Sequence, residues 1–144
     1  MTGEAITILL VEDDAAHAEI VRRNLEQSHL ANRLVHVGDG QQALDYLRRT
    51  GKFPDAARPG LILLDLRLPR VDGLEVLREI KEDADLASIP VVVLTTSAAE
   101  SDVAQAYSYR ANSYLVKPVD FGQFVDLMKT LGYYWLIWNR YPAE

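Results

Sequence analysis

The chain has 144 residues, an apolar content of 49%, a net charge of -6 at pH 7 and no cysteine. This length fits one domain with its own core, and the apolar content excludes an intrinsically disordered chain. The acidic balance argues against DNA binding through the domain's own surface, and the lack of cysteine excludes disulfides, thiol catalysis and cysteine-type zinc sites. The N-terminus lacks a signal-peptide pattern, and no apolar run approaches the ~18 residues of a membrane span. We therefore expect a cytoplasmic protein with no membrane segment.

Apolar segments of strand length alternate with segments of helical periodicity. Strands are expected at Ile6–Val11, Leu34–Val37, Leu61–Leu64, Val91–Leu94 and Ser113–Val116. Helices are expected at Ala15–Glu26, around Ala43–Leu47 after an Asp39-Gly40 start signal, at Gly73–Glu82 and Glu100–Arg110, and from Phe121 past Met128. Gly51–Gly60 holds two prolines and two glycines, which is typical of a loop. This alternation predicts an α/β fold whose parallel sheet is covered on both faces, with no attached output domain.

Four of the expected strands end in side chains that can carry chemistry. Glu12 and Asp13 follow the first strand, Asp65 follows the third, Thr95 follows the fourth and Lys117 follows the fifth. Ligands bind beyond the carboxyl ends of parallel strands, so these groups should meet at one edge. Crowded carboxylates hold a proton or recruit a hard cation, and oxygen ligands favour magnesium over zinc. The pattern predicts an aspartate that accepts a phosphoryl group with Mg²⁺ beside it.

Each of these residues also has a simpler interpretation. Asp65 alone would be a cap or turn residue after a strand, and residues 12–14 would be a solvated helix start in which Asp14 is the cap. Thr95 fits ordinary strand content, and Thr96 or Ser97 could supply the hydroxyl instead. A lysine before proline is usually a surface residue. Three histidines are expected at the surface or partly buried, without a carboxylate partner: His17, His29 and His36.

Taken together, the motifs resemble the receiver domain of two-component response regulators. The matching residues are Glu12-Asp13, Asp65, Leu68-Pro69, Asp72-Gly73, Thr95, Tyr114 and Lys117-Pro118. The match extends from Ile6 to about Leu131, with 30 residues from Asp65 to Thr95 and 22 from Thr95 to Lys117. The resemblance implies a flavodoxin-like (βα)5 three-layer sandwich with strand order 2-1-3-4-5 and an extended C-terminal helix.

The resemblance also implies a role for each site residue. Asp65 is the phosphoacceptor, and Mg²⁺ is bound by Asp13, Asp65 and the backbone carbonyl of Arg67, with help from Glu12 through water.

Three further residues act on the phosphoryl group in this family pattern. Lys117 contacts the phosphoryl oxygens, Thr95 moves to hydrogen-bond them, and Tyr114 is an aromatic switch that turns inward when Thr95 moves.

Three functions are compared on this basis. The favoured one is a stand-alone response regulator that accepts a phosphoryl group from a histidine kinase and signals through protein contacts, without being an enzyme. A small-molecule phosphatase with an aspartate nucleophile is disfavoured, because such enzymes usually carry an acid at the position of Arg67. A phosphorylation-independent scaffold is disfavoured, because degenerate receivers lose an acid or the lysine that this chain keeps.

A narrower resemblance is to the small regulators paired with phytochrome-type sensor kinases. It rests on the long loop at 51–60, on Leu64–Arg70, on Leu94–Ser97 and on the aromatic final helix. The expected partners are a sensor histidine kinase of the bacteriophytochrome type, and either a histidine phosphotransfer protein or a direct target protein.

The C-terminal segment carries a separate prediction. We place the receiver domain at residues 1–131 and an aromatic extension at 132–144. The run Tyr133–Trp138 is apolar all round, whereas a helix packed on a sheet needs only one apolar stripe. Either the rings fold back onto the domain or they form a partner surface. We expect a homodimer through the last helix and this extension.

Overall fold

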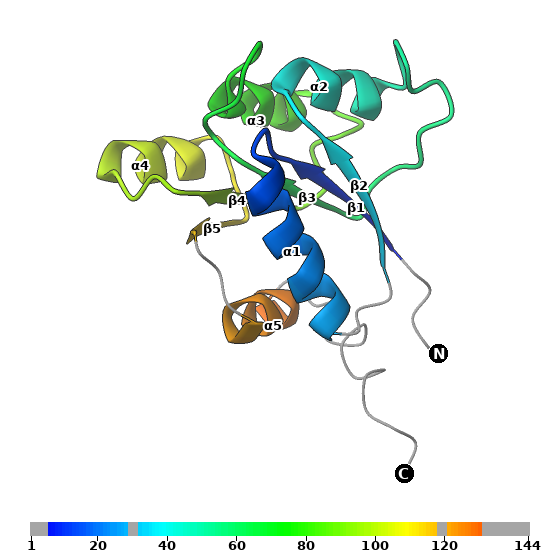
Figure 1. Cartoon of the computed structure of the whole chain (residues 1–144). Helices are drawn as coiled ribbons and strands as arrows, with labels where there is room; N and C mark the ends of the chain where they lie inside the picture. Colours follow the sequence, from blue (N-terminus) through cyan, green and yellow to red (C-terminus); the bar gives the residue numbers. More distant parts are fainter. Residues whose placement is uncertain (1–5, 29–31, 118–120, 131–144) are drawn as a thin grey trace.

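The computed structural model describes residues 6–28, 32–117 and 121–130 (Figure 1). In chain order the elements are β1 (Ile6–Val11), α1 (Ala15–Ser28), β2 (Asn32–Val37), α2 (Gly40–Arg48), β3 (Leu61–Leu64), α3 (Gly73–Glu82), β4 (Val91–Thr95), α4 (Glu100–Ser108), β5 (Ser113–Val116) and α5 (Phe121–Thr130). All strand pairs are parallel, and the sheet order is β2-β1-β3-β4-β5. The expected flavodoxin-like sheet is confirmed.

The predicted boundaries match at β1, β3, β5, α3 and α5, whereas those of β2, β4, α1 and α4 differ. β2 begins at Asn32, two residues before the predicted start, because it pairs with β1 along its whole length. β4 runs one residue further, to Thr95, which pairs with Val116. α1 extends to Ser28. α4 ends at Ser108 rather than at Arg110, whose φ of 70° is left-handed and cannot continue a helix.

The sheet is the middle of three layers. Alternate strand side chains point to opposite faces, so each face gathers its own apolar set. One face packs on α2, α3 and α4 and includes Leu9, Val11, Ile62, Leu64, Val91 and Val93. The other packs on α1 and on Leu127 of α5 and includes Ile8, Leu10, Leu61, Leu63, Val92 and Leu94. Both sets are almost fully buried, which fixes the sheet and therefore the positions of its strand ends.

Two glycines allow the loop after β3 to lie directly against the starts of two helices, α2 and α3. The backbone N–H of Gly73 donates to the carbonyl of Leu66 at 2.9 Å, and a Cβ on Gly73 would lie 2.2 Å from the carbonyl oxygen of Asp65. A Cβ on Gly40 would lie 1.9 Å from the carbonyl oxygen of Val71. Only glycine permits these approaches, so the loop that follows Asp65 is fixed by backbone contacts on both sides.

Several predictions fall on parts of the chain outside the described residues. The aromatic run Tyr133–Trp138 lies there, as do Pro118 and His29. The extended C-terminal helix, the boundary at residue 131 and the dimerisation arm therefore stay predictions. Across the described ranges, none of the helices combines the length and the apolar character needed to cross a membrane.

Candidate phosphoacceptor site

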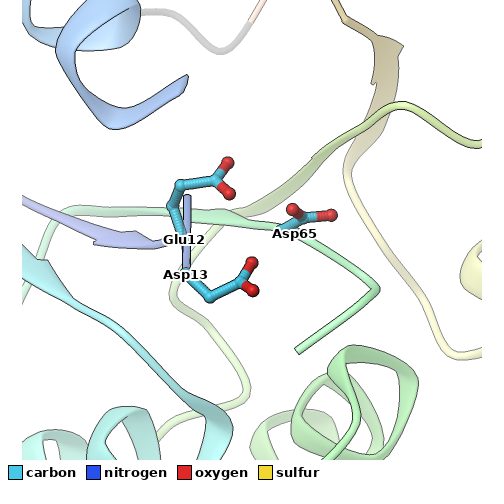
Figure 2. Close-up of side chains that lie close together, drawn as sticks. All are labelled: Glu12, Asp13 and Asp65. Atoms are coloured by element: carbon cyan, nitrogen blue, oxygen red, sulfur yellow. The ribbon is translucent and has the colours of Figure 1, made fainter. Parts of the chain in front are cut away.

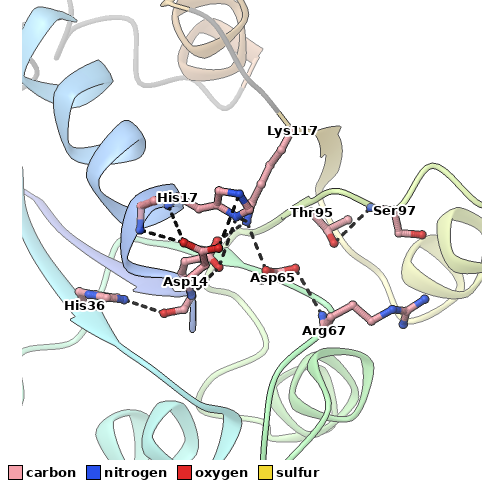
Figure 3. Close-up of polar contacts among 10 residues, drawn as sticks. Asp14, His17, His36, Asp65, Arg67, Thr95, Ser97 and Lys117 are labelled. Carbon is pink, nitrogen blue, oxygen red and sulfur yellow. Dashed lines mark hydrogen bonds and ion pairs between the residues drawn. The ribbon is translucent and has the colours of Figure 1, made fainter.

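The parallel register brings four strand ends to one edge of the sheet. Val11 pairs with Leu64, and the backbone N–H of Asp65 donates to the carbonyl of Val11 at 3.0 Å. Further along the same edge, between β4 and β5, the N–H of Lys117 donates to the carbonyl of Thr95 at 2.8 Å. As a result the side chains at the carboxyl ends of β1, β3, β4 and β5 face a common site (Figure 3).

Three carboxylates converge at this edge (Figure 2). Glu12, Asp13 and Asp65 each place an oxygen within 4.8 Å of the others. Glu12 and Asp65 are buried and Asp13 is exposed, so the cluster opens to solvent on one side. The backbone N–H of Arg67 donates to Asp65 Oδ1 at 3.3 Å and brings the Arg67 backbone beside this carboxylate. An all-oxygen set of this size fits a hard divalent cation.

Lys117 compensates part of this negative charge. Its Nζ forms ion pairs with Glu12 Oε1 and, at 3.2 Å, with Asp65 Oδ2. The lysine side chain is only 9% exposed, so water screens these pairs weakly. When all four groups are charged, three carboxylates against one ammonium leave two negative charges. A divalent cation would neutralise them.

The surroundings of Glu12 act against the charged form of its carboxyl. Burial raises the pKa of its carboxyl, and the nearby charge of Asp65 raises it further. The hydrogen bond from Lys117 and the backbone N–H of Asp14, which donates to Glu12 Oε2 at 3.1 Å, lower the pKa in part. A cation bound beside Glu12 would favour the charged form.

Asp14 begins α1 as expected of a helix cap. Its Oδ1 accepts from the N–H groups of Ala16 at 2.8 Å and His17 at 3.2 Å, and these bonds lower the pKa of the Asp14 carboxyl. Its role is therefore to fix the start of α1.

The prediction that the histidines lack a carboxylate partner is wrong for His17. Its Nδ1 lies 3.9 Å from Glu12 Oε2 and its Nε2 lies 3.9 Å from Asp14 Oδ2. The same Nδ1 lies 3.0 Å from Lys117 Nζ. His36 Nε2 lies 2.7 Å from the backbone oxygen of Glu12. The position of His17 three residues after Asp14, on the first turn of α1, was the signal that could have revealed it.

Thr95 and Tyr114 are linked through the loop after β4. Thr95 is fully buried at the strand end, whereas Thr96 is exposed. The N–H of Ser97 lies 3.5 Å from Thr95 Oγ1, and the hydroxyl of Tyr114 donates to the carbonyl of Ser97 at 2.8 Å. Burial raises the pKa of the Tyr114 hydroxyl. The two predicted switch residues therefore contact the same residue, Ser97.

Comparison with known proteins agrees with this geometry. The family model "Response regulator receiver domain" matches residues 8–129. The chain therefore belongs to the receiver domain family of response regulators. It is 47% identical to the probable methanogenesis regulatory protein FilR2 of Methanothrix harundinacea, covering 94% of this chain and 87% of that protein. It is 42% identical to response regulator Rcp1 of Synechocystis, covering 94% and 92%.

Solved structures of response regulators are also similar, and two of them are named as phytochrome or bacteriophytochrome response regulators. The bacteriophytochrome response regulator RtBRR gives a TM-score of 0.84 at 48% identity, over 96% of this chain and 85% of that chain. The phosphorylated cyanobacterial phytochrome response regulator RcpA gives 0.80 at 41%, over 96% and 99%. The Mn²⁺-bound form of Rcp1 gives 0.79 at 42%, over 91% and 94%. The resemblance to this subgroup is confirmed.

Proposed function

We propose that this chain accepts a phosphoryl group on Asp65 from a histidine kinase, in a reaction that needs Mg²⁺, and then signals through protein contacts. The observation that carries the proposal is the gathering of Lys117, Glu12 and Asp13 around the Asp65 carboxylate, with Lys117 paired to both Glu12 and Asp65. The similarity to a phosphorylated regulator and to a Mn²⁺-bound one supports it.

The transfer would proceed by direct displacement at phosphorus. A carboxylate oxygen of Asp65 forms the new P–O bond while the P–N bond of a phosphohistidine breaks, and the bonding pair stays on the imidazole nitrogen. Such transfers depend on in-line positioning and charge neutralisation. The ammonium of Lys117, already 3.2 Å from Asp65 Oδ2, would neutralise a phosphoryl oxygen.

The oxygen ligands at this edge would hold Mg²⁺. They are the carboxylates of Asp13 and Asp65 and the backbone carbonyl of Arg67, with Glu12 acting through water. When bound, the ion supplies positive charge where the phosphoryl oxygens develop negative charge.

Thr95 and Tyr114 would convert phosphorylation into a conformational change. A hydrogen bond from the Thr95 hydroxyl to the phosphoryl group exists only in the phosphorylated state. Such a differential contact shifts a pre-existing equilibrium. The hydroxyl of Tyr114 donates to the carbonyl of Ser97, which lies two residues after Thr95, and the ring would move inward with this loop.

The two alternative functions have less support. A phosphatase would need a general acid two residues after Asp65, but Arg67 occupies that position and its guanidinium binds Asp102. A phosphorylation-independent scaffold would not need Glu12, Asp13 and Lys117 around the acceptor.

Intact-mass spectrometry after incubation with acetyl phosphate and Mg²⁺ tests the proposal. The wild type should gain one phosphoryl group, and Asp65→Asn should gain none. Asp55→Asn, an exposed aspartate in the loop before β3, is the matched control and should label like the wild type. Asp13→Asn should lose the Mg²⁺-dependent labelling. Wild-type labelling of Asp65→Asn would reject Asp65 as the acceptor.

The partners are proposed from the similar proteins. We expect a sensor histidine kinase of the phytochrome type as the donor, and we propose a cytoplasmic location for the reaction. A histidine phosphotransfer protein or a target protein would receive the signal. Phosphotransfer from a panel of labelled histidine kinases tests the donor.

We also propose the homodimer through α5 and residues 132–144. Sedimentation of the wild type and of a chain truncated after Leu131 tests it. A monomeric wild type, or a truncated chain that still dimerises fully, would contradict it.

A further inference from the structure

The imidazole of His17, on the first turn of α1, contacts the side chain of Lys117. Its Nδ1 lies 3.0 Å from Lys117 Nζ, and Figure 3 shows the ring beside the end of the lysine side chain. An ammonium has three N–H donors and no acceptor, so the ring nitrogen that faces it has to accept a hydrogen bond. In this geometry the ring proton of His17 therefore lies on Nε2.

A positively charged imidazolium fits this geometry poorly. Its Nδ1–H would point at the ammonium, so two donors and two like charges would face each other. Glu12 Oε2 and Asp14 Oδ2 each lie 3.9 Å from a ring nitrogen, which is too long for a hydrogen bond. Of these three contacts, the one with Lys117 is the shortest and the one within hydrogen-bond distance.

His17 completes a set of three acceptors around the ammonium of Lys117. The other two are Glu12 Oε1 and, at 3.2 Å, Asp65 Oδ2. Three acceptors match the three N–H donors, so they fix both the place and the rotation of the ammonium. This matters for a lysine, because its charge sits at the end of a flexible four-carbon stem.

The proposed reaction changes two of these three acceptors. Asp65 forms the new bond to phosphorus, and Glu12 acts on Mg²⁺ through water. His17 takes part in neither step. Its Nδ1 is therefore the one of the three that stays available to the ammonium while the phosphoryl group is transferred.

The apolar side chains beside the imidazole cannot replace it. His17 and Lys117 line a cavity of about 150 Å³ between α1 and the end of β4. Ile20, Val21 and Leu94 also line this cavity, and their side chains cannot accept a hydrogen bond. Water that entered in place of the ring would accept the same bond but would not be held to α1.

We propose that His17 is a positioning residue, which holds the ammonium of Lys117 at the phosphoryl site through the hydrogen bond that its Nδ1 accepts. This inference rests on the proposed function, because the place of the ammonium matters only if Lys117 has to meet a phosphoryl oxygen on Asp65. It predicts that phosphorylation requires an acceptor at the place of Nδ1 rather than an imidazole ring as such.

Initial rates of labelling by acetyl phosphate in saturating Mg²⁺, at one pH, test this role. His17→Leu lacks the acceptor and should label roughly tenfold more slowly, as expected when a charge-assisted hydrogen bond no longer positions a reacting group. His17→Asn should recover most of the rate, because asparagine Oδ1 is as many bonds from the backbone as histidine Nδ1. A helix effect would give the opposite order, since leucine favours a helix more than asparagine does.

Arg23→Leu is the matched control. It places a leucine on the same helix, about 9 Å further along the axis. The side chain of Arg23 is 72% exposed there, and its Nε lies 3.2 Å from Glu19 Oε2. This variant should label at the wild-type rate.

The ¹⁵N NMR spectrum of the histidine rings gives a second readout that does not depend on labelling. In the wild type the His17 signals should show the proton on Nε2. In Lys117→Met the donor to the ring is gone, so the Nδ1 signal of His17 should shift.

Two kinds of result would overturn the proposal. One is a rate for His17→Leu equal to that of Arg23→Leu, or a rate for His17→Asn no higher than that of His17→Leu. The other is a His17 ring with both nitrogens protonated, or a ring spectrum that Lys117→Met leaves unchanged. Failure of the proposed function is distinguishable, because the wild type itself would then not label, whereas the ring spectrum would still report the contact with Lys117.

Discussion

Replacing Gly73, the first residue of α3, by alanine should displace the backbone of the proposed phosphoacceptor, Asp65. The added Cβ would lie 2.2 Å from the carbonyl oxygen of Asp65 and 2.5 Å from Leu66 Cα. Ordinary contact begins at 3.4 Å, so the backbone at Asp65 must retreat by roughly 1 Å. The methyl group meets backbone atoms, which cannot rotate away as a flexible side chain would.

The expected loss of stability follows from two opposing terms. Overpacking a well-packed site costs about 1–3 kcal/mol, and a clash with backbone belongs at the upper end. Alanine in a helix gains at most ~1 kcal/mol over glycine. The net loss should therefore be about 2 kcal/mol. Phosphorylation should slow as well, because a misplacement of ~1 Å can cost about 100-fold in rate.

Urea unfolding and the initial rate of labelling by acetyl phosphate measure the two effects. Gly38→Ala is the control, since the nearest atom to its added Cβ is Gln42 Oε1 at 4.0 Å. It should keep wild-type labelling and nearly wild-type stability. The reasoning fails if Gly73→Ala labels as fast as Gly38→Ala, because the loop would then absorb the methyl group without moving Asp65.

Three further predictions concern separate parts of the molecule. Thr95→Ala should still accept a phosphoryl group but show much smaller beryllofluoride-induced NMR shifts at Tyr114; undiminished shifts would move suspicion to Thr96. Lys81→Met should lose ~2 kcal/mol in urea unfolding while labelling normally, because the buried ammonium donates to three neutral oxygens near the start of β4, far from the strand ends that carry the site. Burial raises the pKa of the Glu12 carboxyl above its ordinary value, so protons should compete with the metal at a higher pH than they would at an exposed glutamate. Mg²⁺ affinity, measured by NMR titration, should fall as the pH is lowered from neutral, and an affinity that does not change as the pH is lowered would contradict the assignment.

The fold could be predicted because its signals are local. Continuous apolar runs such as Leu61–Leu64 and Val91–Val93 are typical of strands buried on both faces, and the structure buries them completely. Strand ends were less certain, because pairing decides them. Asn32 has little strand propensity by itself, but it pairs with Ile6 and so extends β2.

The site could be predicted only where its residues follow strands. Glu12, Asp65 and Lys117 were found because parallel strands end at one edge, whatever lies between them in sequence. The ion pair between Asp102 and Arg67 could not be predicted, since an acid on the first turn of a helix usually only favours the helix start. Arg67 is 35 residues away from Asp102, and nothing in the sequence pairs the two residues.

The ion pair between Glu12 and Lys117 spans 105 residues, and it has a consequence for how the protein acquires its activity. Glu12 follows β1, whereas the lysine follows β5, which among the described strands is the last to leave the ribosome. During synthesis the acidic cluster is therefore present before its cation, and no partial sheet can complete the site. Long-range pairings of this kind form late and slowly, after loop closure has been achieved elsewhere. In a refolding experiment, competence for acetyl phosphate should accordingly appear with the final cooperative phase rather than with early helix formation.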